Sequence, residues 1–209
     1  MSTNRFDTAA ADWDQKQRRV DLAAAIAAGI AALPLHQEME ALEYGCGTGL
    51  VGLALAPRLG SLVAADSSPG MIAALSDKIA AQGLTNVRPL LLDLHSGDCP
   101  QRFDLIFSAM TLHHLADVDT ILAKLVQCLK PGGILALADL DSEDGSFHHD
   151  NPEGVRHHGF DRTQLAAALR RLGLGAIESS TVHTVMKENA AGEKQPFPVF
   201  LLTAHKDRT

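Results

Sequence analysis

Hydrophobic residues follow two different spacings, which alternate along the chain. Short apolar runs, typical of strands buried in a sheet, are separated by segments whose apolar residues recur every three or four positions, as on one face of a helix. Strands that alternate with helices predict a mostly parallel, doubly wound α/β sheet. The predicted strands are residues 41–44, 61–65, 87–92, 104–108 and 134–140, and the predicted helices are 22–33, 50–56, 69–82 and 118–129.

Residues with strong positional preferences mark several boundaries. Pro34 ends the first helical pattern. Ser68 is suited to the N-cap and Pro69 to the first position of a helix that Gly83 stops. Lys-Pro-Gly-Gly at residues 130–133 breaks the next helical pattern, so we expect the fifth strand to begin after it.

The pattern changes after the fifth strand. Residues 141–159 are polar and contain several histidines, and Asp161 with Gln164 resembles a capping box for a helix that ends near residue 172. Two last strands with a polar loop between them predict an antiparallel hairpin. These three segments are residues 177–185, 187–195 and 197–205. We expect one domain over residues 1–209, with ligands at the carboxyl ends of the parallel strands.

Composition and charge narrow the function. The chain has 209 residues, of which 46% are hydrophobic, and a formal net charge of −7. That charge, without any Lys/Arg-rich run, disfavours nucleic acid as a partner. The apolar segment 22–35 follows a mixed-charge run and is too short for a membrane span. We expect a cytoplasmic protein without membrane contact, while its oligomeric state is not indicated.

The cysteines do not form a recognisable motif. Cys46, Cys99 and Cys128 are widely spaced, odd in number and form no Cys-x-x-Cys pair. This usage suits a reducing compartment and argues against a zinc site. We expect all three to be free thiols.

Three glycines at alternate positions form the strongest local motif. Gly45, Gly47 and Gly49 stand between the first predicted strand and an Ala/Leu-rich helical segment. Glycine permits positive φ and has no Cβ, so the chain can turn sharply while a ligand packs against main-chain atoms. A dinucleotide-binding G-x-G-x-x-G motif that starts at Gly45 needs glycine at position 50, where Leu50 stands.

With Glu43 ahead of it, this loop resembles the E/D-x-G-x-G-x-G motif of class I S-adenosylmethionine-dependent methyltransferases, of the small-molecule type similar to methyltransferase types 11 and 12. The resemblance extends over most of the chain. It implies a Rossmann-like, doubly wound, seven-stranded sheet with an antiparallel C-terminal hairpin. It also implies transfer of a methyl group from S-adenosyl-L-methionine to a small-molecule acceptor by in-line displacement, with S-adenosyl-L-homocysteine as product.

Further cofactor-binding positions are implied in the family's order. Asp66, with Ser67 beside it, closes the second strand, where the family's acidic residue accepts hydrogen bonds from both ribose hydroxyls; the alternative is a solvated loop aspartate. Asp93 corresponds to the residue that binds the adenine amino group, or is a turn residue. The remaining candidates are Leu94 and Met71 against the adenine, with Met71 equally suited to the core, and Ser108 and Ala109 beside the methionine moiety.

The N-terminal segment, residues 1–36, resembles the lid helix that small-molecule methyltransferases fold over the cofactor. Asp7, Trp13 and Asp14 carry this likeness. Trp13 is the chain's only tryptophan. It either contacts the ligands under a lid or anchors a helix on the core.

Histidines dominate the candidates for the acceptor side. His113 and His114 follow the fourth strand in a segment that resembles the family's H-H-L-x-D sequence. They either shape the acceptor pocket and accept its proton or hydrogen bond to loop backbone. Asp139 and Asp141 close the fifth strand and either contact the acceptor or support the fold.

A loop insertion at residues 141–160 follows the fifth strand. Four histidines and Asp150 gather there and suit an acceptor pocket, a metal site or an exposed loop, but their spacing matches no metal motif, so we expect no metal. Arg156 is positioned to pair with an anionic group of the acceptor. The histidines are His148, a candidate for catalysis, and His149, His157 and His158, candidates for acceptor binding.

Two other functional classes remain open at this point. An NAD-dependent dehydrogenase uses a related fold, although the position of the third glycine and the closing hairpin disfavour it. A non-catalytic protein that binds S-adenosylmethionine would carry the same glycines and acidic residues.

Overall fold

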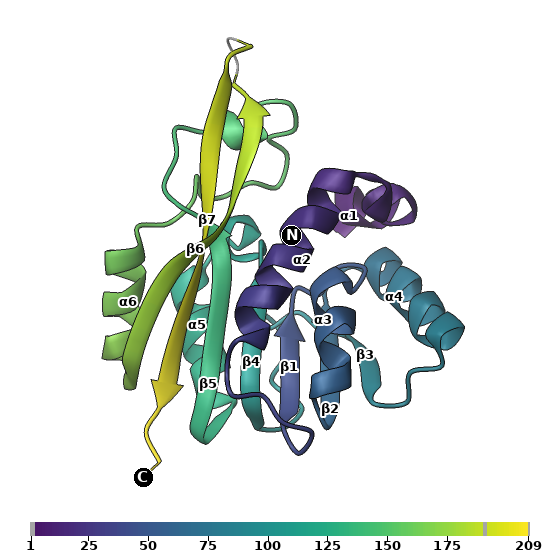
Figure 1. Cartoon of the computed structure of the whole chain (residues 1–209), viewed down its shortest axis with the longest axis vertical. Coiled ribbons are helices and arrows are strands. Elements are labelled where there is room, and N and C mark those ends of the chain that lie inside the picture. Colours follow the sequence, from purple (N-terminus) through teal and green to yellow (C-terminus); the bar gives the residue numbers. More distant parts are fainter. Residues whose placement is uncertain (1–2, 190–191, 209) are drawn as a thin grey trace.

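The computed structural model describes residues 3–189 and 192–208 of the chain. Residues 1–2 of the predicted lid region, residues 190–191 of the predicted hairpin loop and residue 209 lie outside this description. Seven strands form one sheet in the order β3-β2-β1-β4-β5-β7-β6 (Figure 1). The strands are β1 (Glu40–Tyr44), β2 (Ser61–Asp66), β3 (Val87–Leu91), β4 (Phe103–Ala109), β5 (Leu129–Leu140), β6 (Leu174–Glu188) and β7 (Lys194–Lys206).

The sheet is parallel from β3 to β5 and closes with an antiparallel hairpin. β1 pairs in parallel with β2 and β4, whereas β7 runs antiparallel to both β5 and β6. The topology changes direction between β1 and β4, where the chain crosses from one side of the sheet to the other. Parallel sheets open a ligand-binding crevice at such a point. The predicted seven-stranded α/β sheet with a closing hairpin is thus confirmed.

Helices cover both faces of the sheet. Apolar residues of α2 and α3 pack with one set of strand side chains, and those of α5 and α6 pack with the set on the opposite face. Figure 1 shows α2 and α3 in front of the sheet. The α-helices are α1 (Thr3–Ala9), α2 (Gln17–Ala31), α3 (Leu50–Leu55), α4 (Pro69–Gln82), α5 (Val118–Gln127) and α6 (Arg162–Arg171).

Local signals predicted the helix ends well. The Ser68 hydroxyl accepts a hydrogen bond from the Met71 N–H at the start of α4, and Gly83 ends that helix in the left-handed conformation. The Asp161 carboxylate caps α6 by accepting from the Gln164 N–H. Each of these residues satisfies a backbone group that the helix itself leaves unpaired.

The bounds of three strands differ clearly from the prediction. β5 begins at Leu129 rather than after residue 133, because Leu129 pairs with Phe103 and a register shift accommodates the glycines that follow. β6 and β7 extend beyond the predicted strands, and their pairing continues to Glu188 with Lys194. Pairing between strands therefore overrides the local helix-breaking and loop signals in these segments.

The prediction of three free thiols is wrong for two cysteines. Cys99 and Cys128 form a disulfide, and only Cys46 is a free, buried thiol. Cys99 lies in the loop before β4 and Cys128 follows α5. Phe103 of β4 pairs with Leu129 of β5, and this pairing joins the two segments in space. Sequence spacing gives no indication of that proximity.

The N-terminal segment folds over α4 at one end of the sheet. α1 and the 3₁₀ helix η1 (Ala10–Gln15) both contact α4. The Asp7 carboxylate accepts hydrogen bonds from the Ser68 hydroxyl and the Gly70 N–H at the start of α4. Within residues 3–189 and 192–208, no helix has the length and apolar character that crossing a bilayer requires.

Candidate active site

A cavity of about 250 Å³ lies at the carboxyl ends of the central parallel strands. One side is formed by the turn from β1 to α3 and by the end of β2, and the other by the segments that follow β4 and β5. Phe6 and Trp13 of the N-terminal segment also line the cavity. Residues that are distant in the sequence therefore meet at the topological crossover of the sheet.

Backbone atoms of the glycine loop form one wall of the cavity. Gly45, Gly47 and Gly49 all have positive φ, at 75°, 52° and 85°. A Cβ on Gly45 would collide with the side chain of Thr111, whereas a Cβ on Gly47 would have only the Met71 sulfur nearby, at 3.9 Å. Gly45 and Gly47 line the cavity, while Gly49 lies at the start of α3 and packs against Leu75 instead. Gly47 leaves the open space that a ligand against the loop needs.

Asp66 faces this loop from the end of β2. Its two carboxylate oxygens accept hydrogen bonds from the N–H groups of Gly47, at 2.8 Å, and Ser68, at 2.9 Å. Burial raises the pKa of the Asp66 carboxyl, against the lowering effect of these N–H donors. Asp66 and Ser67 both line the cavity. The carboxylate therefore combines backbone support with access to the cavity.

Glu43 is buried beneath the same loop. Its side chain is 1% exposed, and the Oε2 atom has no hydrogen-bond partner among the described residues. Burial, followed by the negative charge of Asp66, raises the pKa of Glu43 to about 8. Glu43 is therefore mostly protonated at neutral pH, although it lines the cavity.

Of the other residues predicted to bind the cofactor, some line the cavity and others do not. Met71 and Ala109 line the cavity. Asp93 accepts a hydrogen bond from the His95 N–H in a turn, Leu94 is fully buried, and the buried Ser108 hydroxyl donates to the Tyr44 carbonyl. The last three residues are outside the cavity lining, so their contact with a cofactor stays a prediction.

A hydrogen bond and an ion pair of Asp14 connect the N-terminal segment to the part of the cavity that contains the glycine loop. The Thr48 hydroxyl donates to the Asp14 carboxylate at 2.6 Å, and Asp14 also pairs with Lys78 of α4. Trp13 lines the cavity and lies under the Arg19 guanidinium, 3.6 Å from the ring centroid. The lid therefore contacts the glycine loop through Asp14 and presents Trp13 to the cavity.

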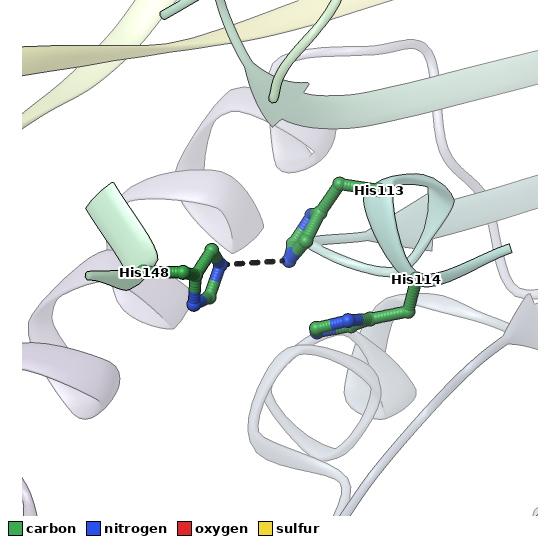
Figure 2. A group of neighbouring side chains, drawn as sticks. All are labelled: His113, His114 and His148. Atoms are coloured by element: carbon green, nitrogen blue, oxygen red, sulfur yellow. Dashed lines mark hydrogen bonds between the residues drawn. The ribbon is translucent and has the colours of Figure 1, made fainter. Parts of the chain in front are cut away.

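A cluster of histidines forms the opposite end. The buried His113 lies within η3 (Leu112–His114), and its Nδ1 is 2.7 Å from an oxygen of the buried Asp139. Its Nε2 is 3.2 Å from Nε2 of His148, which ends η4 (Ser146–His148). Figure 2 shows the rings of His113 and His148 facing each other and His114 beside them. All three histidines line the cavity.

Two of these imidazoles are neutral at physiological pH. Burial, followed by the proximity of His113, lowers the pKa of His114 to about 2. The same two causes lower the pKa of His148 to about 3. Their ring nitrogens therefore present lone pairs and N–H groups rather than positive charge.

Comparison with known proteins agrees with this site. Residues 41–133, which contain the glycine loop, Asp66 and β4, match the family model described as "Methyltransferase domain". Over these residues, somewhat less than half of its length, the chain carries a methyltransferase domain. This match favours a methyltransferase over the dehydrogenase alternative, and the third glycine at Gly49 agrees with it.

Several methyltransferases are similar to this one. An uncharacterized methyltransferase of Schizosaccharomyces pombe is 34% identical over 58% of this chain and 48% of its own length. Trans-aconitate 2-methyltransferase of Deinococcus radiodurans is 33% identical over 65% of this chain and 51% of its own length. This methyltransferase thus spans about half the length of these curated relatives.

A solved structure shares the fold closely. The DhpI–SAH complex superimposes with a TM-score of 0.74 at 22% identity and covers 98% of this chain and 94% of its own. At that identity the likeness concerns the fold.

The remaining acceptor candidates of this methyltransferase lie outside the cavity lining. His149 Nδ1 bonds to the Ser146 carbonyl, and His157 Nε2 bonds to the Leu115 carbonyl. His158 faces Glu143, and the Arg156 backbone N–H donates to the His113 carbonyl. The predicted loop therefore contributes His148 and Asp150 to the cavity and uses these neighbours to hold its own shape.

The contacts of Asp141 likewise support the fold. Its two carboxylate oxygens accept hydrogen bonds from Nε and Nη2 of Arg162, both at 2.6 Å. This bidentate pair joins the end of β5 to α6. Asp141 is not among the residues that line the cavity of this methyltransferase.

Sequence reasoning missed several cationic residues of the cavity, among them Arg5 and Lys187. Arg5 reaches it from α1, and its buried Nη1 atom has no hydrogen-bond partner among the described residues. Lys187 reaches it from β6 and pairs with Asp150 and the Phe147 carbonyl. Neither residue belongs to a motif, so only the folded chain reveals them.

Proposed function

We propose that this methyltransferase transfers a methyl group from S-adenosylmethionine to a small anionic acceptor. The observation that supports this proposal is a single cavity that connects the glycine loop and Asp66 at one end with a buried histidine cluster at the other. A donor and an acceptor held in one enclosure satisfy the main requirement of an in-line displacement, which is positioning without competing water.

The donor end suits the cofactor that the family uses. Asp66 has two acceptor oxygens for the adjacent ribose hydroxyls, and the space above Gly47 admits a ligand against the backbone. Oε2 of Glu43, which has no partner among the described residues, adds a buried polar atom beneath the loop. When bound, S-adenosylmethionine supplies an electrophilic methyl group on a sulfonium sulfur, and the C–S bond breaks as the acceptor bonds to carbon, leaving S-adenosylhomocysteine.

The cavity is rich in cationic side chains. Its lining includes Arg5, Lys16, Arg18, Arg19 and Lys187, of which Arg5 and Lys187 lie near enough to His148 to lower its pKa. Arg5 carries the buried, unpartnered Nη1 described above, and a carboxylate or phosphate oxygen would satisfy it. Trans-aconitate 2-methyltransferase, a relative, is named for a substrate with several carboxylates.

His113 is placed to take a proton where the acceptor is a hydroxyl. Asp139 fixes its orientation and supports the positive charge that protonation of the ring creates. A carboxylate acceptor needs no base, and for it the histidines would only shape the chamber and exclude water.

The first test is binding of S-adenosylhomocysteine, measured by isothermal titration calorimetry, with NADH titrated separately. We expect S-adenosylhomocysteine to bind and NADH not to bind. Asp66→Asn keeps one acceptor oxygen and introduces an N–H donor toward the Gly47 N–H, so we expect a loss of about 10- to 100-fold in affinity. Asp77→Asn changes an exposed carboxylate of α4 and serves as the matched control.

The second test is turnover. The protein is incubated with methyl-labelled S-adenosylmethionine and a panel of small carboxylates and phosphates, and label transfer is measured. Transfer to an anionic acceptor, reduced in Arg5→Gln, is the expected result. Tight binding of S-adenosylhomocysteine with no transfer to any member of the panel would instead favour a non-catalytic binding protein.

A further inference from the structure

Three imidazoles converge at the acceptor end of the cavity. One ring nitrogen from each of His113, His114 and His148 lies within 4.8 Å of the other two. Figure 2 shows the three side chains arriving from two separate segments, with His113 and His114 on one and His148 on the other. We propose that these histidines bind one divalent transition-metal ion, with Zn²⁺ as the best fit, and leave its fourth position open to the cavity.

The hydrogen bonds of the two adjacent histidines select the tautomer that binds metal. A carbonyl oxygen only accepts, so His114 must donate its Nδ1–H to the Gly154 carbonyl at 3.0 Å. His113 likewise directs Nδ1 to the Asp139 carboxylate. In the neutral form of each ring, a donating Nδ1 leaves the lone pair on Nε2, the nitrogen that would bind the metal.

The spacing of the nitrogens fits a small cation. Nε2 of His113 and Nε2 of His148 are 3.2 Å apart. Two nitrogens bound tetrahedrally at about 2.0–2.1 Å from Zn²⁺ are separated by about 3.3–3.4 Å. The separation of this pair is thus close to what Zn²⁺ requires, and a ring nitrogen of His114 lies within 4.8 Å of both.

Asp139 lies where it hydrogen bonds to a proposed metal ligand, His113, rather than to the metal itself. It is fully buried and also accepts hydrogen bonds from the backbone N–H groups of His113 and Leu140. A carboxylate behind a histidine fixes the ring orientation and makes the imidazole a stronger ligand, as in many zinc sites. Three histidines with one open position is also a ligand set of catalytic rather than structural zinc.

The open position faces the proposed acceptor chamber. A cation there would hold an oxygen of an anionic acceptor and orient it toward the donor end. Metal binding itself requires only the three histidines, so this inference goes beyond the proposed function and does not depend on it. With the ion bound, Nε2 of His113 is a ligand and does not take a proton from the acceptor.

The test is metal binding by the tag-free full-length protein after treatment with a chelator. Titration with Zn²⁺ by calorimetry is expected to show one equivalent, and Co²⁺ is expected to produce the visible absorption bands of a tetrahedral site. His148→Ala should weaken Zn²⁺ binding by more than the 10- to 100-fold that loss of an outer-shell partner costs, and Asp139→Asn should cost about 10- to 100-fold. His149→Ala, which changes the next residue of the same loop, should leave the affinity unchanged.

The result that overturns the proposal is an absence of stoichiometric Zn²⁺ binding, or binding that His148→Ala leaves intact or that His149→Ala weakens as much. In that case a proton shared between His113 and His148 accounts for their short separation. Thermal unfolding and S-adenosylhomocysteine titration of each variant show that the fold and the donor site persist. Failure of metal binding with intact cofactor binding would therefore refute this inference alone, and the opposite pattern would refute the proposed function alone.

Discussion

Replacing Glu43 with glutamine should stabilise the protein, and by an amount that grows with pH. The glutamine keeps an oxygen for the Gly52 N–H but cannot ionise. In the wild-type fold, burial raises the pKa of Glu43 from 4.5 to about 8. The folded state therefore holds a proton that the unfolded state has lost, so the free energy of unfolding decreases as pH rises between these two values.

The magnitude follows from the size of the interval. Each pKa unit corresponds to about 1.4 kcal/mol, so the full interval represents about 5 kcal/mol and the part below pH 7 about 3 kcal/mol. The stability of Glu43→Gln relative to wild type should accordingly increase by about 1.4 kcal/mol for each pH unit from 5 to 8, and then level off.

The assay is urea unfolding of both proteins at pH 5, 6, 7 and 8, followed by circular dichroism. Glu38→Gln, at an exposed glutamate, is the matched control and should track wild type at every pH. Parallel stability profiles for wild type and Glu43→Gln would refute the reasoning, because they would mean that Glu43 ionises in the folded state as readily as in the unfolded chain.

Three further predictions concern single contacts. Gly45→Ala should cost more unfolding free energy than Gly83→Ala, which has a similar positive φ but open space around it, with about 1–2 kcal/mol expected for the φ strain alone; equal costs would refute the predicted collision. Cys99→Ser with Cys128→Ser should lower stability by about 3.5 kcal/mol, given the 29-residue separation, and mass spectrometry without reductant should detect the bond in wild type. Asp141→Asn should cost about 1 kcal/mol in urea unfolding, and a loss of turnover beyond that would return Asp141 to the acceptor site.

Elements fixed by local chemistry could be predicted from the sequence. The Ser68 cap, the Gly83 stop and the Asp161 cap depend on residues within a few positions of one another, and the structure has all three. The glycine loop and Asp66 were equally accessible, since a strand-to-turn-to-helix transition and a strand-ending carboxylate are local patterns.

Features that depend on distant segments could not be predicted. The bond between Cys99 and Cys128 requires the pairing of β4 with β5, which no spacing in the sequence encodes. For the same reason the histidine-rich loop suggested six polar candidates, of which His148 and Asp150 reach the cavity. Arg5 carries no local signal at all, because its place depends on how the lid segment folds back.

Early and late segments of the chain supply different parts of the cavity. Gly45, Gly47 and Asp66 come from the β1–β2 part of the chain, whereas His148 and Lys187 come from the segments after β5. In Figure 1 the β6–β7 hairpin projects past the other strands, beside the loop that carries η4. Substitutions in these late segments can therefore alter part of the proposed acceptor end of the cavity while the glycine loop and Asp66 keep their places.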